Sequence, residues 1–135
     1  MERWNELVTA SGKVKISSKP ARIRAWIKAL RSGKYKQGVG ELHNDGRFCC
    51  LGVLCDLYRK STKDGYWTED GFVYGYESVA AYGLPPIVQA WAGVTNENPS
   101  ICTDAALTAV DANDSLEMTF DQIADKLEAE LDAET

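Results

Sequence analysis

Apolar residues recur at helical spacing in the segment that begins at Lys19. Pro20 suits the first position of a helix, and Gly33 suits the residue just past its end. The apolar positions follow an i, i+3, i+4, i+7 pattern: Ile23, Trp26, Ile27 and Leu30. This spacing predicts an amphipathic helix whose basic residues lie largely off the apolar stripe, toward water or a partner.

Three further helices are predicted farther along the chain. The run from Cys50 to Tyr58 is apolar almost all round, which is typical of a helix buried on most sides. A short helix is expected from Pro86 to Gly93, because proline suits a helix start and glycine a helix end. Thr119 and Gln122 have the spacing of a capping box, and the apolar positions after them share one face, which predicts a C-terminal helix.

Turn sequences predict two β-hairpins. Residues 37–49 contain Asn-Asp-Gly at positions 44–46, with Val39 and Leu42 on the first arm. Residues 66–76 alternate aromatic and polar side chains around a Glu-Asp-Gly turn. Residues 107–110 suit either a short helix or a strand. We therefore expect an α+β fold, with three to five helices packed on a small antiparallel sheet of hairpins.

The size and apolar content of the chain suit one domain over residues 1–135. A chain of 135 residues that is 44% hydrophobic can bury a core without a metal or a disulfide. Its longest apolar run, Phe48 to Leu57, has about half the length needed to cross a bilayer. The first residues lack the cationic start and apolar stretch of a secretory signal. We expect a cytoplasmic protein with no membrane partner.

Charge is distributed unevenly along the chain. The net charge is −5, but residues 1–36 hold ten basic and two acidic residues, whereas residues 101–135 hold one basic and ten acidic. The basic end suits a surface that faces phosphate, whereas the alternative is that the two ends pair with each other. We prefer pairing. A pI near 4.9 argues against a dedicated binder of duplex DNA.

The spacing of the four cysteines argues against a metal or disulfide role. Cys49 and Cys50 are adjacent, and Cys55 and Cys102 follow at distances that do not match the close pairs of zinc sites. We expect buried free thiols, no metal and no cofactor. The alternative is a small Cys/His hydrolase, in which Cys49 or Cys50 at a helix start reacts with help from His43 across the turn.

A set of cationic, amide and aromatic side chains suits a nucleotide-type ligand, because phosphates take charge-assisted hydrogen bonds and bases stack on rings. A free helix N-terminus near residues 49–51 would add backbone donors. The alternative is that the aromatic side chains are core and the cations are surface. The candidate ligand-binding residues are Lys34, Tyr35, Gln37, His43, Arg47, Trp67, Tyr74 and Tyr76. No catalytic residues are assigned.

Several strings in the chain resemble a family of small proteins encoded by tailed bacteriophages and prophages. The most distinctive strings are residues 26–38, WIKALRSGKYKQG, and residues 48–57, FCCLGVLCDL. Three weaker matches are Leu-Pro-Pro at 84–86, QAWAG at 89–93 and FDQIAD at 120–125. The resemblance spans most of residues 20–131. We expect residues 19–131 to form the globular core and residues 1–18 to be a variable N-terminal segment.

The resemblance implies a phage accessory protein in the cytoplasm of an infected bacterium. By analogy with other small acidic phage proteins, we expect it to act against host defences by binding and sequestering a nucleotide-type signal. We also expect a homo-oligomer, since small domains often complete a pocket at a subunit interface. The alternative partner is a host defence protein, docked on the acidic C-terminal helix or the basic N-terminal helix.

Overall fold

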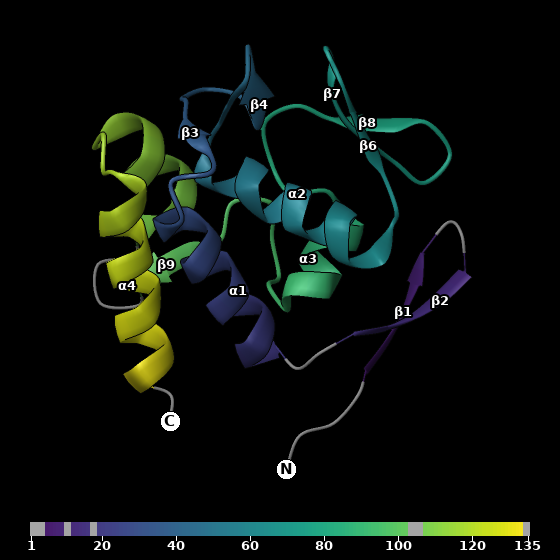
Figure 1. Ribbon diagram of the computed structural model, residues 1–135, viewed down its shortest axis with the longest axis horizontal. Helices are drawn as coiled ribbons and strands as arrows, with labels where there is room; N and C mark the ends of the chain where they lie inside the picture. Colours follow the sequence, from purple (N-terminus) through teal and green to yellow (C-terminus); the bar gives the residue numbers. More distant parts are fainter. Residues whose placement is uncertain (1–4, 10–11, 17–18, 103–106, 134–135) are drawn as a thin grey trace.

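The structure, a computed structural model, describes residues 5–9, 12–16, 19–102 and 107–133 (Figure 1). The chain folds as one α+β domain, as the pattern predicts. The helical elements are α1 (Lys19–Arg31), α2 (Cys50–Thr62), α3 (Pro86–Ala92), the π-helical turn η1 (Asp111–Ser115) and α4 (Phe120–Ala133). No helix of the described segments is long and apolar enough to span a membrane.

The strands form four small sheets, rather than the one sheet that we predicted. Three sheets are antiparallel: β1–β2, β9–β10 and β6–β7–β8. The fourth has the order β3–β5–β4 and is mixed, because β3 runs parallel to β5. The strands are β1 (Asn5–Thr9), β2 (Gly12–Ile16), β3 (Lys36–Gln37), β4 (His43–Asn44), β5 (Arg47–Phe48), β6 (Tyr66–Thr68), β7 (Gly71–Tyr74), β8 (Ser78–Ala80), β9 (Ser100–Cys102) and β10 (Leu107–Thr108).

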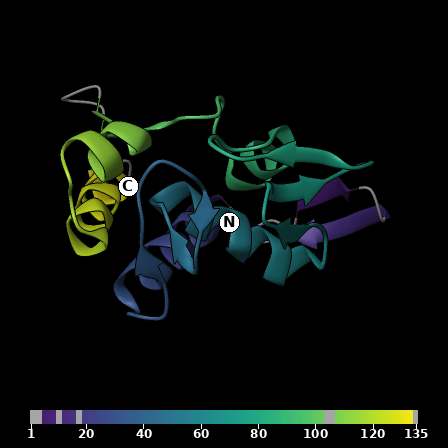
Figure 2. The same ribbon diagram turned by 90° about the horizontal axis from the view of Figure 1, so that it is seen from above.

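Helix α2 lies at the centre of the domain, as its apolar composition predicts. Figure 2 shows α4 at one end of the molecule and the β6–β7–β8 sheet at the other. Leu51, Val53, Leu54 and Tyr58 of α2 are fully buried. The indole nitrogen of Trp26 on α1 donates to the Cys50 carbonyl at 2.9 Å, which ties α1 to the first turn of α2.

Helices α1 and α4 pack side by side, and their charged side chains pair (Figure 1). Arg31 contacts Asp125 at 2.7 Å and Glu128 at 3.1 Å, and Arg24 lies 3.6 Å from Asp132. The basic and acidic ends of the chain therefore neutralise each other in part. These exposed pairs orient the two helices, but pairs of this kind contribute little to stability.

The first hairpin is shorter than predicted. Its arms are only β4 and β5 around Asp45 and Gly46, and β3 lies on the other side of β5. Val39, expected on the first arm, is 64% exposed, whereas Leu42 is fully buried but lies just before β4. The reason is the detour of residues 38–42, which carries the chain from one side of β5 to the other.

The other predicted boundaries agree with the structure more closely. The second hairpin forms as β6–β7, although sequence reasoning missed its third strand, β8, and the N-terminal hairpin β1–β2. Helix α3 ends at Gly93, whose φ of 77° is the left-handed conformation of a glycine cap. Thr119 and Gln122 exchange the two reciprocal hydrogen bonds of a capping box at 2.9 and 3.1 Å. Residues 107–108 are a strand.

Candidate ligand-binding site

Five aromatic rings from separate parts of the chain pack against one another beside α2. His43 lies between Phe48 and Trp67, with ring centroids 4.5 and 5.3 Å away. Trp67 also contacts Phe72 at 5.0 Å, and Tyr35 meets Phe48 edge-on at 5.0 Å. We call these five residues the aromatic cluster. It unites three of the eight candidate residues: Tyr35, His43 and Trp67.

The buried carboxylate of Asp56 holds the aromatic cluster in place. Asp56 lies on α2 and is 4% exposed. It accepts a hydrogen bond from the Tyr35 hydroxyl at 2.6 Å and another from the Trp67 indole nitrogen at 2.9 Å. Arg59, one turn along the helix, supplies a third donor at 2.9 Å and the compensating charge. Because the Tyr35 hydroxyl and the Trp67 indole N–H are both anchored, the faces of these two rings have fixed directions.

The protonation state of this network follows from its geometry. Burial alone would raise the pKa of Asp56, but hydrogen bonds from Tyr35, Trp67 and Arg59 outweigh burial and hold that pKa below its ordinary value of 3.8. Burial and the adjacent carboxylate both raise the pKa of the Tyr35 hydroxyl. At neutral pH the site therefore contains an ionised Asp56 and a protonated Tyr35, each in the form that suits the hydrogen bond between them.

A groove opens beside the aromatic cluster, between the β4–β5 and β6–β7 hairpins. We call it the hairpin groove. Its volume is about 360 Å³, and its ring walls are His43 and Trp67. The remaining lining residues are Asn44, Asp45, Gly46, Thr68 and Glu69. Two of these are carboxylates, so the groove suits a planar group with hydrogen-bond donors better than it suits a phosphate.

Arg47 lies on the opposite face of the β4–β5 hairpin from His43. The pairs across this hairpin are His43 with Phe48 and Asn44 with Arg47, and successive pairs face opposite sides. Accordingly Arg47 lines a second groove of about 380 Å³, together with Gln37, and donates to the Gln37 carbonyl at 3.3 Å. Arg47, the cation predicted to bind phosphate, therefore lies on the opposite side of the β4–β5 hairpin from the rings predicted to stack on a base.

The half-buried side chain of Gln37 takes part in a hydrogen-bond network that joins the N-termini of α2 and α4. Its amide nitrogen donates to Asn113 at 2.9 Å and to the Met118 carbonyl at 2.8 Å, and its oxygen accepts from the Phe120 backbone at 3.1 Å. Asn113 is 1% exposed and accepts from the Cys50 backbone at 3.1 Å. The prediction of a free helix N-terminus at residues 49–51 is therefore wrong, because these residues are buried and Asn113 accepts from the Cys50 N–H.

The other three candidate residues lie apart from the aromatic cluster. Lys34 lines a groove between α1 and α4 together with Arg24, Lys28 and Arg31. Tyr74 is half-buried and lines a surface depression beside Pro85 and Pro86. Tyr76 is 91% exposed. The fold therefore does not bring all eight candidate residues into a single pocket.

The cysteines are free thiols in the core or at its margin. Cys49 is 6% exposed, and Cys50 and Cys55 are fully buried. Burial raises the pKa of the Cys49 thiol to about 11, and burial likewise raises the pKa of Cys50. Such protonated thiols are weak nucleophiles at neutral pH. Within the described segments no group of three or more His, Cys, Asp or Glu residues is arranged to hold a metal.

We predict slow alkylation of Cys49 and Cys50 in the native protein. With iodoacetamide at pH 7.5, mass spectrometry is expected to find label first on Cys102, which is only partly buried. A Cys102→Ser variant should then remain almost unlabelled until the protein is unfolded. Rapid labelling of Cys49 or Cys50 in that variant would instead support the Cys/His alternative.

Sequence reasoning missed the two residues that organise this region. Asp56 had a visible signal, because it is the one charged residue between Cys50 and Tyr58 in an otherwise apolar run. A charge in a helix that is buried on most sides needs partners, and Tyr35 and Trp67 supply them. Asn113 had no local signal, since it reaches Cys50 across 63 positions of the sequence.

Comparison with known proteins gives a family but no function. No curated protein and no solved structure matches the chain. A family model described as a domain of unknown function, DUF8296, matches residues 19–131. This range runs from the start of α1 to the last turn of α4, and so includes both the aromatic cluster and Asp56. The chain therefore belongs to the DUF8296 family.

Proposed function

We propose that the protein binds a small nucleotide-type ligand without transforming it, and that the ligand's base enters the hairpin groove. The observation that supports this is the ring pair of His43 and Trp67, whose centroids are 5.3 Å apart and which line the groove together, with Trp67 anchored on Asp56. An anchored ring lowers the entropy lost on stacking, and stacking on an aromatic side chain contributes about 1–3 kcal/mol per base.

The polar lining of the groove favours bases that carry exocyclic amino groups. Asp45 and Glu69 offer carboxylate oxygens, which accept hydrogen bonds, to a group in the groove. Adenine, guanine and cytosine have an amino donor for such acceptors, whereas uracil has none. Phosphates would lie outside the groove, and Arg47 on the other face of the hairpin is the candidate to contact them.

The biological role follows as part of the same proposal. The resemblance to tailed-phage proteins supports an accessory protein that sequesters a nucleotide signal of host defence in the bacterial cytoplasm, as a homo-oligomer. Direct docking of a host protein is the alternative. The pairing of Arg24 and Arg31 with α4 reduces the free charge on the two helices, which weakens that alternative.

Calorimetry with mononucleotides, cyclic dinucleotides and cyclic ADP-ribose isomers tests the proposal. We expect at least one adenine- or guanine-containing ligand to bind, and His43→Ala to weaken binding about tenfold by removing one wall of the groove. Tyr76→Ala is the matched control, because it removes an exposed ring distant from the aromatic cluster. Its affinity should equal that of the unmodified protein.

Two results would contradict the proposal. The first is the absence of binding by every ligand in the panel at millimolar concentration. The second is a His43→Ala variant that unfolds at the same temperature as the unmodified protein and binds equally well. Trp67→Ala is a less suitable test, because it also removes a hydrogen bond to buried Asp56 and so lowers stability.

A further inference from the structure

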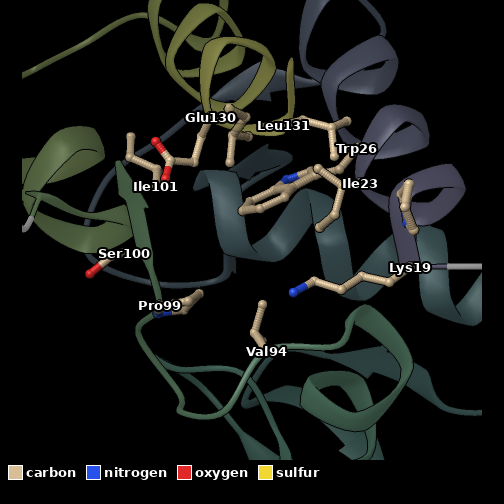
Figure 3. Close-up of a pocket in the computed structure, with 11 residues that line it drawn as sticks. Lys19, Ile23, Trp26, Val94, Pro99, Ser100, Ile101, Glu130 and Leu131 are labelled. Carbon is tan, nitrogen blue, oxygen red and sulfur yellow. The ribbon is translucent and has the colours of Figure 1, made fainter. Parts of the chain in front are cut away.

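A second concavity, separate from the hairpin groove, lies between α1, α4 and the segment that leads into β9 (Figure 3). We call it the α1–α4 pocket. Its volume is about 120 Å³, and most of its wall is apolar. Trp26 and Ile101 are each 1% exposed, so these parts of its wall are fixed by the core. Its apolar lining residues include Ile23, Trp26, Val94, Ile101, Leu127 and Leu131.

Two opposite charges border this apolar space. The Lys19 ammonium points into the pocket in Figure 3, and Glu130 lies across it, on the α4 side. The Lys19 stem passes over Gly93, where an added Cβ would lie only 2.7 Å from the Lys19 Cδ atom. The missing side chain at Gly93 thus leaves the space through which Lys19 reaches the pocket.

Neither Lys19 nor Glu130 forms an ion pair within the described part of the chain. Arg24 and Arg31 pair with α4 at other positions, Asp125, Glu128 and Asp132. Glu130 is on the same helix but is turned toward the pocket. The ammonium and the carboxylate are therefore available to a molecule that occupies the space between them.

The volume of the pocket limits the size of that molecule. A dry cavity of about 150 Å³ holds benzene, whereas pockets for drug-sized ligands are about 300 Å³ or more. At about 120 Å³, the pocket suits a branched side chain of four carbons and is too small for a nucleotide. The ligand needs an apolar body of this size and two opposite charges at its exposed end.

We propose that the α1–α4 pocket binds a free apolar α-amino acid of about the size of leucine. The side chain packs against Ile23 and Val94, two of the more accessible apolar residues of the wall, the α-carboxylate pairs with Lys19, and the α-ammonium pairs with Glu130. Both pairs are charge-assisted hydrogen bonds at the mouth of an apolar site, where water is partly excluded. This site is independent of the hairpin groove and goes beyond the proposed nucleotide binding.

Three probes separate the parts of the proposal: L-leucine, 4-methylpentanoate, which lacks the amino group, and 3-methylbutylamine, which lacks the carboxylate. By NMR titration we expect L-leucine to bind at least about tenfold more tightly than either analogue, because each loses one charged hydrogen bond. If either analogue binds as tightly as L-leucine, the assignment of both charged contacts is wrong. No binding of L-leucine up to about 10 mM would overturn the site, since two charged pairs and a buried side chain should exceed that affinity.

Variants of the pocket provide a second test. Lys19→Met and Glu130→Gln should each weaken L-leucine binding at least about tenfold, whereas Lys28→Met, an exposed lysine of the same helix outside the pocket, should not. Val94→Phe should fill the pocket and abolish binding while the protein stays folded. Retained binding in Val94→Phe would contradict the location. His43→Ala is expected to leave L-leucine binding unchanged, which separates this site from the hairpin groove.

Discussion

Gly52→Ala is expected to lower the free energy of unfolding by more than about 3 kcal/mol, although alanine is the better helix former by about 1 kcal/mol. A Cβ at position 52 would lie 1.8 Å from the Leu42 carbonyl oxygen and 2.7 Å from its carbonyl carbon. Leu42 cannot move away cheaply, because its backbone bonds to Ala81 at 2.8 Å and to Cys49 at 3.2 Å. Urea denaturation followed by circular dichroism measures the change.

Gly83→Ala is the matched control for that measurement. An added Cβ there would meet the Cβ of Glu97 at 3.0 Å, and no left-handed backbone angle opposes the substitution. Because the contact is at 3.0 Å rather than 1.8 Å, a shift of a few tenths of an ångström at Glu97 relieves it, and the expected loss is less than about 1 kcal/mol. If Gly52→Ala is as stable as Gly83→Ala, then α2 does not approach the segment before β4 as closely as the structure shows.

Asp56→Ala is expected to cost about 3–5 kcal/mol, the usual result of removing one partner from a buried charged network. The Tyr35 hydroxyl, the Trp67 indole N–H and the Arg59 guanidinium would all lose an acceptor. Asp56→Asn keeps the shape and one acceptor oxygen, so its loss should be smaller. Near-ultraviolet circular dichroism should also change in both variants, because the rings of Tyr35 and Trp67 lose their fixed orientation.

The same network predicts how stability depends on pH. The pKa of Asp56 is lower in the folded protein than its ordinary value of 3.8, so the folded state favours the ionised form. The resulting stabilisation is fully present above about pH 4 and is lost as the pH falls through the folded-state pKa. Between about pH 4 and pH 2, stability should fall more steeply in the unmodified protein than in Asp56→Asn. Parallel curves would contradict the lowered pKa.

The helices were the most predictable elements, because their signals are local. Pro20, the apolar spacing after it and Gly33 define α1, and the capping box at Thr119 begins α4 in the structure as it does in the sequence. The first hairpin was less predictable. The turn was predicted correctly. The pairing of β3 with the other side of β5 was not, because it depends on the path of residues 38–42, which no local sequence pattern encodes.

The candidate site was only partly predictable, for a related reason. Residue type identified rings and cations suited to a nucleotide. Tyr35, His43 and Trp67 do belong to one cluster, in which Phe48 contacts all three rings. The pleat of the β4–β5 hairpin then placed Arg47 on the far face, since neighbouring strand residues point to opposite sides. Gln37 contacts Asn113, 76 positions away, so the amide nitrogen of this candidate residue is already engaged in a hydrogen bond within the protein.

By itself, then, the sequence determined the helices, the turns, the α+β class and the pairing of opposite charges, because periodicity, glycine and proline act over a few residues. Tertiary structure alone decided which side chains share a surface. It buried Asp56 among Tyr35, Trp67 and Arg59, brought Asn113 to the start of α2, and left Lys19 and Glu130 facing across an apolar space. Those contacts depend on how segments far apart in the sequence pack against one another, and local sequence patterns do not indicate that packing.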